Sequence, residues 1–546
     1  MNNLFFFAAT CTILLISCTN ESNNTGGTEK KNKNISSRNY NVTPSNAYSD
    51  LFLDSTAVEN FINEKKIPDS IARRIRSFYN SRNFEFAWFT SSGLTEQARG
   101  FWNLHNHYTS STDDSTLDNK ALKKRMDNLI TEEFISPSAK NKTFVNTELQ
   151  LTADFIRHTL RAYDEDYVKR KEMERFVPAM KQDAFYLADS LLKKKHKDDK
   201  YYEDVNPSYG LLKEKLATYY DIHTKGGWPV IPAAKKSYKK GVTAPAIVLI
   251  KKRLQLTDDL PAPDTSQVFN DTLEKAVKKF QRRHGLEANG IIDKTTLKEM
   301  SVPVAHRIQQ LLINMDRMRW LPVQPQGELI TVNIPAFKLY VTEGNKKVYD
   351  MDVVVGKEGH DTRIFTGNLN QVVFSPHWNV PKSIVEKEIL PAIEKNPDYL
   401  EEQNMELTED KDGDGLPEIR QKPGGENALG KVKFLFPNSF NIYFHDTPSK
   451  SLFKKDKRAF SHGCIRLSDP EWLATYLLRD QPKWDAAKIN EAMNSGEEKF
   501  VKVKNPVPVL IAYYTAWVDE AGELNFREDI YGHDAELTQK MFSRSL

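Results

Sequence analysis

Residues 460–467 read Phe-Ser-His-Gly-Cys-Ile-Arg-Leu and contain Cys464, the one cysteine outside the first 18 residues of the chain. A second histidine, His445, lies upstream, and residues 446–460 separate it from Ser461. A thiol attacks as its thiolate, and a free thiol with a pKa of about 8.5 is mostly protonated at neutral pH. A nearby histidine can accept that proton. Cys464 and His445 are therefore the predicted nucleophile and base.

Gly463 directly precedes the predicted nucleophile. Because glycine has no side chain, a substrate can approach the backbone closely at this point. The amide groups near Gly463 and Cys464 would then be available to bind an oxyanion. The alternative is that Cys464 is a small buried apolar residue and that His445 and His462 are ordinary polar residues. The residues alone do not decide which histidine is the base.

His445 followed by Ser-His-Gly-Cys-Ile-Arg at this spacing resembles the active-site signature of the L,D-transpeptidases, the YkuD-type catalytic domain. Arg466 stands where some forms of the signature have asparagine, and arginine also occurs there in the family. The resemblance implies a thioester on Cys464, with His445 as the base and Asp446 orienting it through its backbone or its side chain. The family pattern favours the backbone.

The same resemblance assigns the neighbouring residues to the substrate pocket. Ser461 and His462 are expected to shape the pocket, and Tyr443 is a further candidate for holding the oxyanion. Arg466 is expected either to bind a stem-peptide carboxylate in bidentate fashion or to form a salt bridge inside the domain. The implied substrates are a tetrapeptide donor and an amine acceptor of peptidoglycan, and no cofactor or metal is implied.

Length and composition predict several globular domains. The chain has 546 residues, which is too long for one core, and 39% hydrophobic residues. Its 77 Lys and Arg against 74 Asp and Glu give a net charge of +3. Without a concentrated basic stripe, this balance argues against a nucleic-acid partner.

The N-terminus predicts export. Residues 1–18 contain an apolar run that is shorter than the roughly 20 residues of a membrane-spanning helix, and they end at Cys18. They resemble the signal peptide of a bacterial lipoprotein, which implies lipidation of Cys18, a membrane anchor and a periplasm-facing location in the envelope. A plain secretory signal and an N-terminal anchor are the alternatives. Residues 19–49 are polar and predict a disordered tether.

The middle of the chain predicts helices. Apolar residues at helical spacing, such as Ile75, Phe78 and Tyr79, indicate a helical domain over 50–245 that resembles the scaffold of long L,D-transpeptidases. Residues 246–300 resemble a three-helix peptidoglycan-binding repeat, and a helical packing module is the alternative. We expect residues 301–325 to form a linking helix.

Residues 326–535 are rich in Val, Ile, Tyr and Thr with turns between, so we expect a mainly β catalytic domain and an α+β, multidomain chain. Residues 343–345 (Glu-Gly-Asn) predict a hairpin turn. Residues 384–430 resemble the insertion that caps the substrate cleft in the long family members. Residues 410–421 begin like a calcium loop, for which an acidic surface turn is the alternative. Residues 536–546 are expected to be a tail.

Three other functions remain open at this point. Water in place of the amine would make the protein an L,D-carboxypeptidase, and a protein amine would make it an enzyme that attaches proteins to the wall. The third is a non-catalytic wall-binding lipoprotein. Because the cysteine and the histidine of the signature are both present, the sequence favours an enzyme. A papain-like protease is disfavoured because no Cys-Trp pair lies near the mature start.

Overall fold

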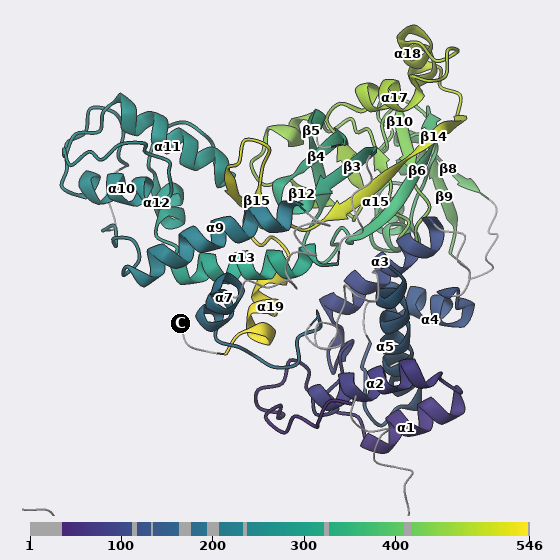
Figure 1. The fold of residues 1–546 in the computed structure, drawn as a ribbon. Helices are drawn as coiled ribbons and strands as arrows, with labels where there is room; N and C mark the ends of the chain where they lie inside the picture. The colour runs from purple at the N-terminus through teal and green to yellow at the C-terminus, as the bar shows by residue number, and fades with distance from the viewer. Residues whose placement is uncertain are drawn as a thin grey trace, which may run out of the picture.

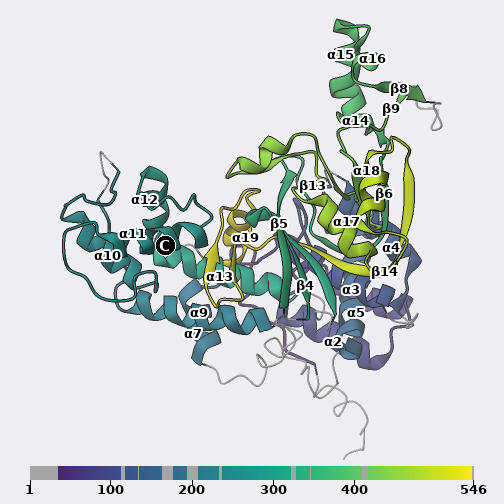
Figure 2. The same ribbon diagram turned by 90° about the horizontal axis from the view of Figure 1, so that it is seen from above.

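The computed structural model describes residues 35–111, 117–132, 135–162, 176–193, 207–232, 237–320, 327–344, 346–408 and 416–543. It has an N-terminal helical body, a central helical body, a small helical domain and a large β domain (Figures 1 and 2). The predicted multidomain α+β fold is confirmed. Cys18 and residues 410–415 of the acidic loop lie outside the described residues.

The N-terminal helical body surrounds a buried aromatic core. Its helices fall where apolar residues recur at helical spacing, as predicted for Ile75, Phe78 and Tyr79, which are buried on α2. Trp88 packs against Phe101 and Phe155, with ring centroids about 5.5 Å apart. Its elements are α1 (Ser55–Glu64), α2 (Asp69–Ser81), β1 (Phe89–Thr90), β2 (Gly93–Leu94), α3 (Glu96–Ser111), α4 (Lys120–Thr131) and α5 (Lys142–Ala162).

The prediction of a tether over 19–49 is wrong from residue 35 onward. Val42 and Tyr48 are buried, and the Asn39 amide donates to the Asn80 carbonyl at 2.8 Å. These few apolar and hydrogen-bonding side chains dock the segment on the N-terminal helical body, although its composition is polar.

The central helical body is assembled from distant parts of the chain, which the predicted boundaries did not anticipate. The predicted scaffold over 50–245 is therefore two bodies, and the predicted linking helix supplies α13, which is buried along almost its whole length. The elements are α7 (Ala184–Lys193), α9 (Pro207–Thr224), α13 (Val304–Met318), β15 (Ala516–Val518), β16 (Leu524–Phe526) and α19 (His533–Met541).

Two further boundaries are corrected by this body. Residues 516–526 were expected to close the β domain, but they form a hairpin of their own that packs on α9 and α13. Residues 536–543 are not a tail, because Leu537, Met541 and Phe542 are buried in the same core.

The small helical domain contains α10 (Ala246–Gln255), α11 (Asp271–Arg283) and α12 (Lys294–Met300). Side-chain caps begin two of its helices. Asn270 accepts from the Leu273 amide at 2.9 Å, and Asp293 accepts from the Thr296 amide at 2.8 Å. Asp293 therefore serves as the N-cap of α12.

The β domain is a nine-stranded sheet in the order β12-β5-β13-β11-β10-β6-β14-β3-β4, and it closes because the long strand β5 pairs with both β4 and β13. The predicted hairpin at 343–345 is confirmed, since β4 ends at Glu343 and β5 begins at Lys346. The strands are β3 (Glu328–Asn333), β4 (Lys338–Glu343), β5 (Lys346–Gly356), β6 (Phe365–Phe374), β10 (Val432–Leu435), β11 (Phe444–His445), β12 (Ala459–Ser461), β13 (Ile465–Leu467) and β14 (Lys499–Ala512).

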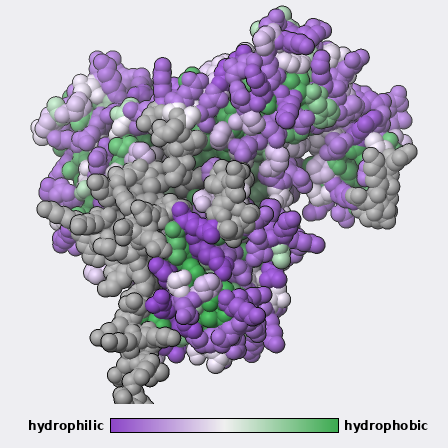
Figure 3. Space-filling model, turned by 45° about the vertical axis from the view of Figure 1, so that its right-hand side comes forward, coloured by the Kyte–Doolittle hydropathy of each residue, from purple (hydrophilic) through white to green (hydrophobic). Residues whose placement is uncertain are grey.

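Apolar side chains from the strands meet those of two helices, α17 (Pro470–Leu478) and α18 (Ala486–Asn494), in the largest core of the molecule. The coloured surface that faces the viewer in Figure 3 is mostly hydrophilic, and hydrophobic residues show in smaller areas between the hydrophilic ones. In the part of the chain that the structure describes, no helix is both long and apolar enough to cross a membrane.

The insertion between β6 and β10 stands out from the β domain in Figure 2 and has its own small core, which includes Val385 and Ile419. It consists of β7 (Trp378–Asn379), α14 (Lys382–Ile384), a π-helical turn (Val385–Ile389), α15 (Leu390–Lys395), α16 (Tyr399–Glu402), β8 (Met405–Thr408) and β9 (Glu418–Gln421).

Candidate active site

Cys464 lies on the tight loop between β12 and β13. Ser461 holds this loop together: its hydroxyl donates to the Cys464 carbonyl at 2.6 Å and accepts from the Gly463 amide at 3.2 Å. Gly463 has a φ of +109°, a conformation that side chains disfavour. Ile465 is fully buried and fixes the loop to the core. The Gly463 amide is engaged, whereas the Cys464 amide has no acceptor among the described residues.

The register of β11 and β13 brings the predicted residues to one face of the sheet. The strands are parallel, with His445 opposite Arg466, and the Ile465 amide donates to the Tyr443 carbonyl at 3.2 Å. Since side chains alternate along a strand, Tyr443 and His445 share a face with Cys464 and Arg466. The intervening residues of both strands face the core.

His445 is buried and its orientation is set by the backbone of Asp446. Its Nδ1 lies 2.5 Å from the Asp446 carbonyl, and because a carbonyl only accepts, Nδ1 carries the proton. Nε2 is therefore the unprotonated nitrogen. Burial, together with the charge of Arg466, lowers the pKa of His445 to about 3. The imidazole is thus neutral at physiological pH and able to accept a proton at Nε2.

Asp446 is held in place from two sides. Its carboxylate accepts from the Lys431 amide at 2.9 Å and from Lys450 Nζ at 2.5 Å. Its own amide donates to Val432 on β10 at 2.9 Å. The Asp446 carbonyl that orients His445 is consequently held in a fixed position.

The thiol of Cys464 is protonated in the resting protein. Burial raises its pKa, while hydrogen bonds from Tyr443 and the charge of Arg466 partly oppose that shift. Sγ donates to the Asn441 carbonyl at 3.8 Å, and no hydrogen bond joins it to His445 among the described residues. Such catalytic contacts often form only once substrate is bound.

Arg466 has no ion-pair partner among the described residues, and its Nε is buried without a hydrogen bond. The expected salt bridge inside the domain is therefore not present in the part of the chain that the structure describes. Burial lowers the pKa of Arg466, and Cys464 opposes that effect. The guanidinium is a free cation beside the thiol and is suited to bind a carboxylate.

His462 faces away from this group. Its Nε2 lies 3.2 Å from Glu388 of the insertion, and its ring lies 4.8 Å from that of His360. Its pKa is lowered, chiefly by burial. His462 joins the active-site loop to the insertion, which leaves His445 as the candidate base.

Sequence reasoning missed two residues that brace the loop. The buried Thr362 hydroxyl donates to the Gly463 carbonyl at 2.8 Å and accepts from the Gly356 amide at 2.9 Å. Tyr531 donates to the Gly356 carbonyl at 2.6 Å and accepts from the Thr362 amide. The stretch that begins at Thr362 resembles a strand beside the active site of the family, but the sequence assigns neither residue a role, because both act on the loop through contacts distant in sequence.

Comparison with known proteins matches residues 327–509 to the L,D-transpeptidase catalytic domain. The chain carries an L,D-transpeptidase catalytic domain of the YkuD type. Residues 73–216 match the Scaffold domain, and residues 243–300 match the "Putative peptidoglycan binding domain".

A curated protein of Haemophilus influenzae named "Putative L,D-transpeptidase" is 30% identical over 242 residues. The match covers 42% of this chain and 49% of the relative, so the chain spans about half the length of the curated relative it matches.

Solved structures give a weaker likeness to the L,D-transpeptidase domain. A Mycobacterium smegmatis L,D-transpeptidase is 16% identical and covers 34% of this chain and 58% of its own, with a TM-score of 0.19. A Stackebrandtia nassauensis L,D-transpeptidase is 14% identical and covers 52% of this chain and 96% of its own, with a TM-score of 0.22.

Metal-ligand side chains do not gather in the described part of the L,D-transpeptidase domain. Within the described residues, no group of three or more His, Cys, Asp or Glu side chains is placed to hold an ion. The groups that surround the predicted nucleophile are the His445 imidazole, the Tyr443 hydroxyl, the Arg466 guanidinium and the backbone of the loop.

Proposed function

We propose that the chain is an L,D-transpeptidase that forms 3→3 cross-links in peptidoglycan through a thioester on Cys464. The observation that carries this proposal is the arrangement on β11 and β13. There a neutral His445, with Nε2 unprotonated, shares a face with the Cys464 thiol and the Arg466 guanidinium, which has no ion-pair partner among the described residues.

In the first half-reaction His445 Nε2 accepts the thiol proton, and the sulfur attacks the carbonyl carbon of the third residue of a tetrapeptide stem. The oxyanion is held by the Cys464 amide and the Tyr443 hydroxyl, and losing one such donor typically costs on the order of 100-fold in rate. The intermediate collapses to the thioester. D-alanine leaves and takes the proton from His445.

In the second half-reaction the side-chain amine of another stem attacks the thioester carbonyl. His445 accepts a proton from the amine and returns it to the departing sulfur, so the thiol of Cys464 is regenerated. Arg466 binds a stem carboxylate and orients the donor. Ser461 and Gly463 keep the loop in its conformation, and His462 connects it to the insertion through Glu388.

The decisive experiment is mass spectrometry of the chain from residue 35 onward incubated with disaccharide-tetrapeptide. A dimer lacking one D-alanine is the expected product, and Cys464→Ala should abolish it without changing the circular dichroism spectrum. A tripeptide without dimer would replace the proposal by L,D-carboxypeptidase activity. A dimer formed at the normal rate by Cys464→Ala would refute the thioester.

Attachment to a membrane is a separate part of the proposal. It rests on residues 1–18 ending in Cys18, and lipidation of that cysteine would hold the enzyme at a membrane facing the periplasm. Metabolic labelling with a fatty-acid analogue tests it. The intact chain should become labelled and Cys18→Ser should not, while equal labelling of both would exclude Cys18 as the site.

A further inference from the structure

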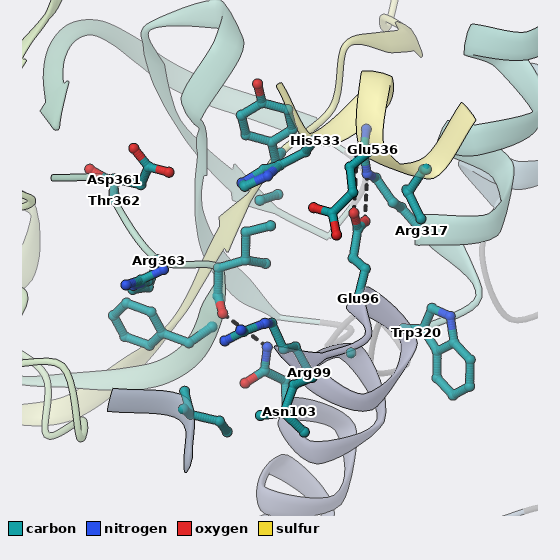
Figure 4. Close-up of a pocket in the computed structure, with 18 of the residues that line it drawn as sticks. Glu96, Arg99, Asn103, Arg317, Trp320, Asp361, Thr362, Arg363, His533 and Glu536 are labelled. Atoms are coloured by element: carbon teal, nitrogen blue, oxygen red, sulfur yellow. Dashed lines mark hydrogen bonds and ion pairs between the residues drawn. The ribbon is translucent and has the colours of Figure 1, made fainter. Parts of the chain in front are cut away.

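A cavity of about 270 Å³ lies where the N-terminal helical body meets the β domain and α19. In Figure 4, Arg99 and Asn103 project into it from α3, and Asp361, Thr362 and Arg363 approach from the segment that leads into β6. Asn103 closes one side by donating to the Ile364 carbonyl at 3.0 Å. Neither Cys464 nor His445 lines this cavity.

More cations than carboxylates line the cavity. The cations are Arg99, Arg317, Arg363 and Lys540, and the carboxylates are Glu96, Asp361 and Glu536. Asp534 does not line the cavity but pairs with Arg317, so four carboxylates stand against the four cations. The pairing of these charges, and not their sum, therefore decides which cations are left for a ligand.

Two of the cations are already neutralised. Arg317 pairs with Glu96 at 2.7 Å and with Asp534 at 2.5 Å, and Lys540 pairs with Glu536 at 2.6 Å. The lining cations without such a pair are therefore the remaining two arginines.

Arg99 and Arg363 have no carboxylate within ion-pair distance among the described residues. Burial and the like charge of Arg363 lower the pKa of Arg99, and the carboxylates of Glu536 and Glu96 oppose this shift. Burial raises the pKa of Asp361, while the charges of His533 and Arg363 lower it, and one of its oxygens is buried without a hydrogen bond. Asp361 forms no ion pair with either arginine among the described residues, so the two guanidiniums are available to bind a carboxylate.

Part of the remaining wall is apolar. Trp320, Phe365 and Phe440 line the cavity, and Trp320 and Phe365 are buried. A ligand that matches both the two arginines and these apolar residues has one carboxylate and a compact apolar body.

We propose that this cavity binds a small monocarboxylate, with its carboxylate between Arg99 and Arg363 and its apolar part against Trp320, Phe365 and Phe440. The carboxylate can come from a free organic acid or from the C-terminal residue of a peptide. The proposal does not rest on the transpeptidase reaction.

The cavity lies next to the active-site loop. Thr362 belongs to the cavity wall, and its hydroxyl donates to the Gly463 carbonyl at 2.8 Å. Phe440 directly precedes Asn441, whose carbonyl accepts from the Cys464 thiol at 3.8 Å. A ligand in the cavity therefore contacts both segments that position the nucleophile.

Isothermal titration of the full chain tests the proposal with three probes. Benzoate represents a free acid, N-acetyl-D-alanine represents a peptide end, and benzamide is the neutral control. At least one acid should bind and benzamide should not, and the acid that binds identifies the source of the carboxylate. If neither acid binds at about 20 mM, a concentration that detects even millimolar affinity, or if benzamide binds as well as benzoate, the proposal fails.

Variants locate the binding site. Arg99→Gln and Arg363→Gln should each weaken acid binding about 10-fold or more, because each removes a charge-assisted contact. Arg76→Gln is the matched control, since Arg76 pairs with Glu59 between α2 and α1, does not line the cavity, and should leave binding unchanged. Equal binding by all four proteins would overturn the assignment.

Two further measurements test whether a variant is misfolded and whether the acid binds in the catalytic cleft and not in the cavity. Removing a guanidinium that lacks a carboxylate relieves repulsion, so the melting temperature of Arg99→Gln without ligand should equal or exceed that of the unchanged chain. Chain whose Cys464 has been alkylated with iodoacetamide should bind the acid with unchanged affinity. Loss of binding on alkylation would move the site to the cleft and refute the proposal.

Discussion

Replacing Thr362 by valine tests whether the active-site loop depends on a residue outside its motif. Valine keeps the shape of the buried side chain but removes the oxygen that the Gly356 amide and the Gly463 carbonyl share at 2.9 and 2.8 Å. Leaving a buried backbone group unsatisfied costs about 1–3 kcal/mol. With two groups affected, we expect the free energy of unfolding to fall by roughly 2–5 kcal/mol.

The catalytic effect follows from the position of the loop. Gly463 directly precedes the nucleophile, and a displacement of about 1 Å in a catalytic group can cost on the order of 100-fold in rate. We therefore expect product formation to drop about 10- to 100-fold at saturating substrate. Urea unfolding and a mass-spectrometric rate assay measure the two effects separately.

Thr475→Val is the matched control for Thr362→Val. Thr475 is exposed on α17, and its hydroxyl donates only to the Glu471 carbonyl of the same helix. It should change stability by no more than about 0.5 kcal/mol and leave the rate unchanged. If Thr362→Val unfolds at the same urea concentration as the unchanged chain and keeps its rate, the Thr362 hydroxyl does not brace the loop.

Three further predictions concern the loop and its neighbours. Gly463→Ala should lower the free energy of unfolding by about 1–3 kcal/mol, measured by urea unfolding. The cost comes from the φ of +109°, since the new Cβ would lie no closer than 3.8 Å to a backbone atom. An unchanged unfolding midpoint would contradict this. Tyr443→Phe should move the pH profile of iodoacetamide alkylation of Cys464 to higher pH, because a hydrogen bond that favours the thiolate is lost; a shift to lower pH would reverse the role of Tyr443. The pKa of His445 is lowered to about 3 in the folded chain, whereas the same side chain has a pKa of about 6.5 in the unfolded chain. As the pH falls from 6.5 towards 3, the unfolded chain therefore binds a proton that the folded chain does not, and the folded state loses stability. His445→Gln should therefore lose less stability than the unchanged chain between pH 7 and pH 4.5, and an equal loss would contradict the buried neutral imidazole.

Local patterns predicted the strands, the turn at 343–345 and the cysteine loop, because each depends on residues close together in sequence. The alternation of apolar residues and the Gly344 turn are sufficient for the pairing of β4 with β5. In the same way the motif around Cys464 contains its own stabilising contact, from Ser461 to the Cys464 carbonyl.

Contacts between distant segments are the features that sequence reasoning did not find. Tyr531 reaches Gly356 across the fold, and nothing around residue 531 distinguishes it from the other tyrosines of the chain. Arg99 and Arg363 similarly meet only because α3 packs beside the start of β6. The choice between the two histidines also required tertiary structure, since it depends on which ring nitrogen the Asp446 carbonyl engages.

The central helical body has a consequence for the order in which the chain folds during synthesis. Helices α9 and α13 bury part of their apolar surface only against β15, β16 and α19, which the ribosome makes later. A growing chain that ends before residue 516 therefore has its nine-stranded sheet available but an incomplete helical core beside it. These later elements complete the core, so a chain released before they are made would leave hydrophobic helix faces open to chaperones and proteases.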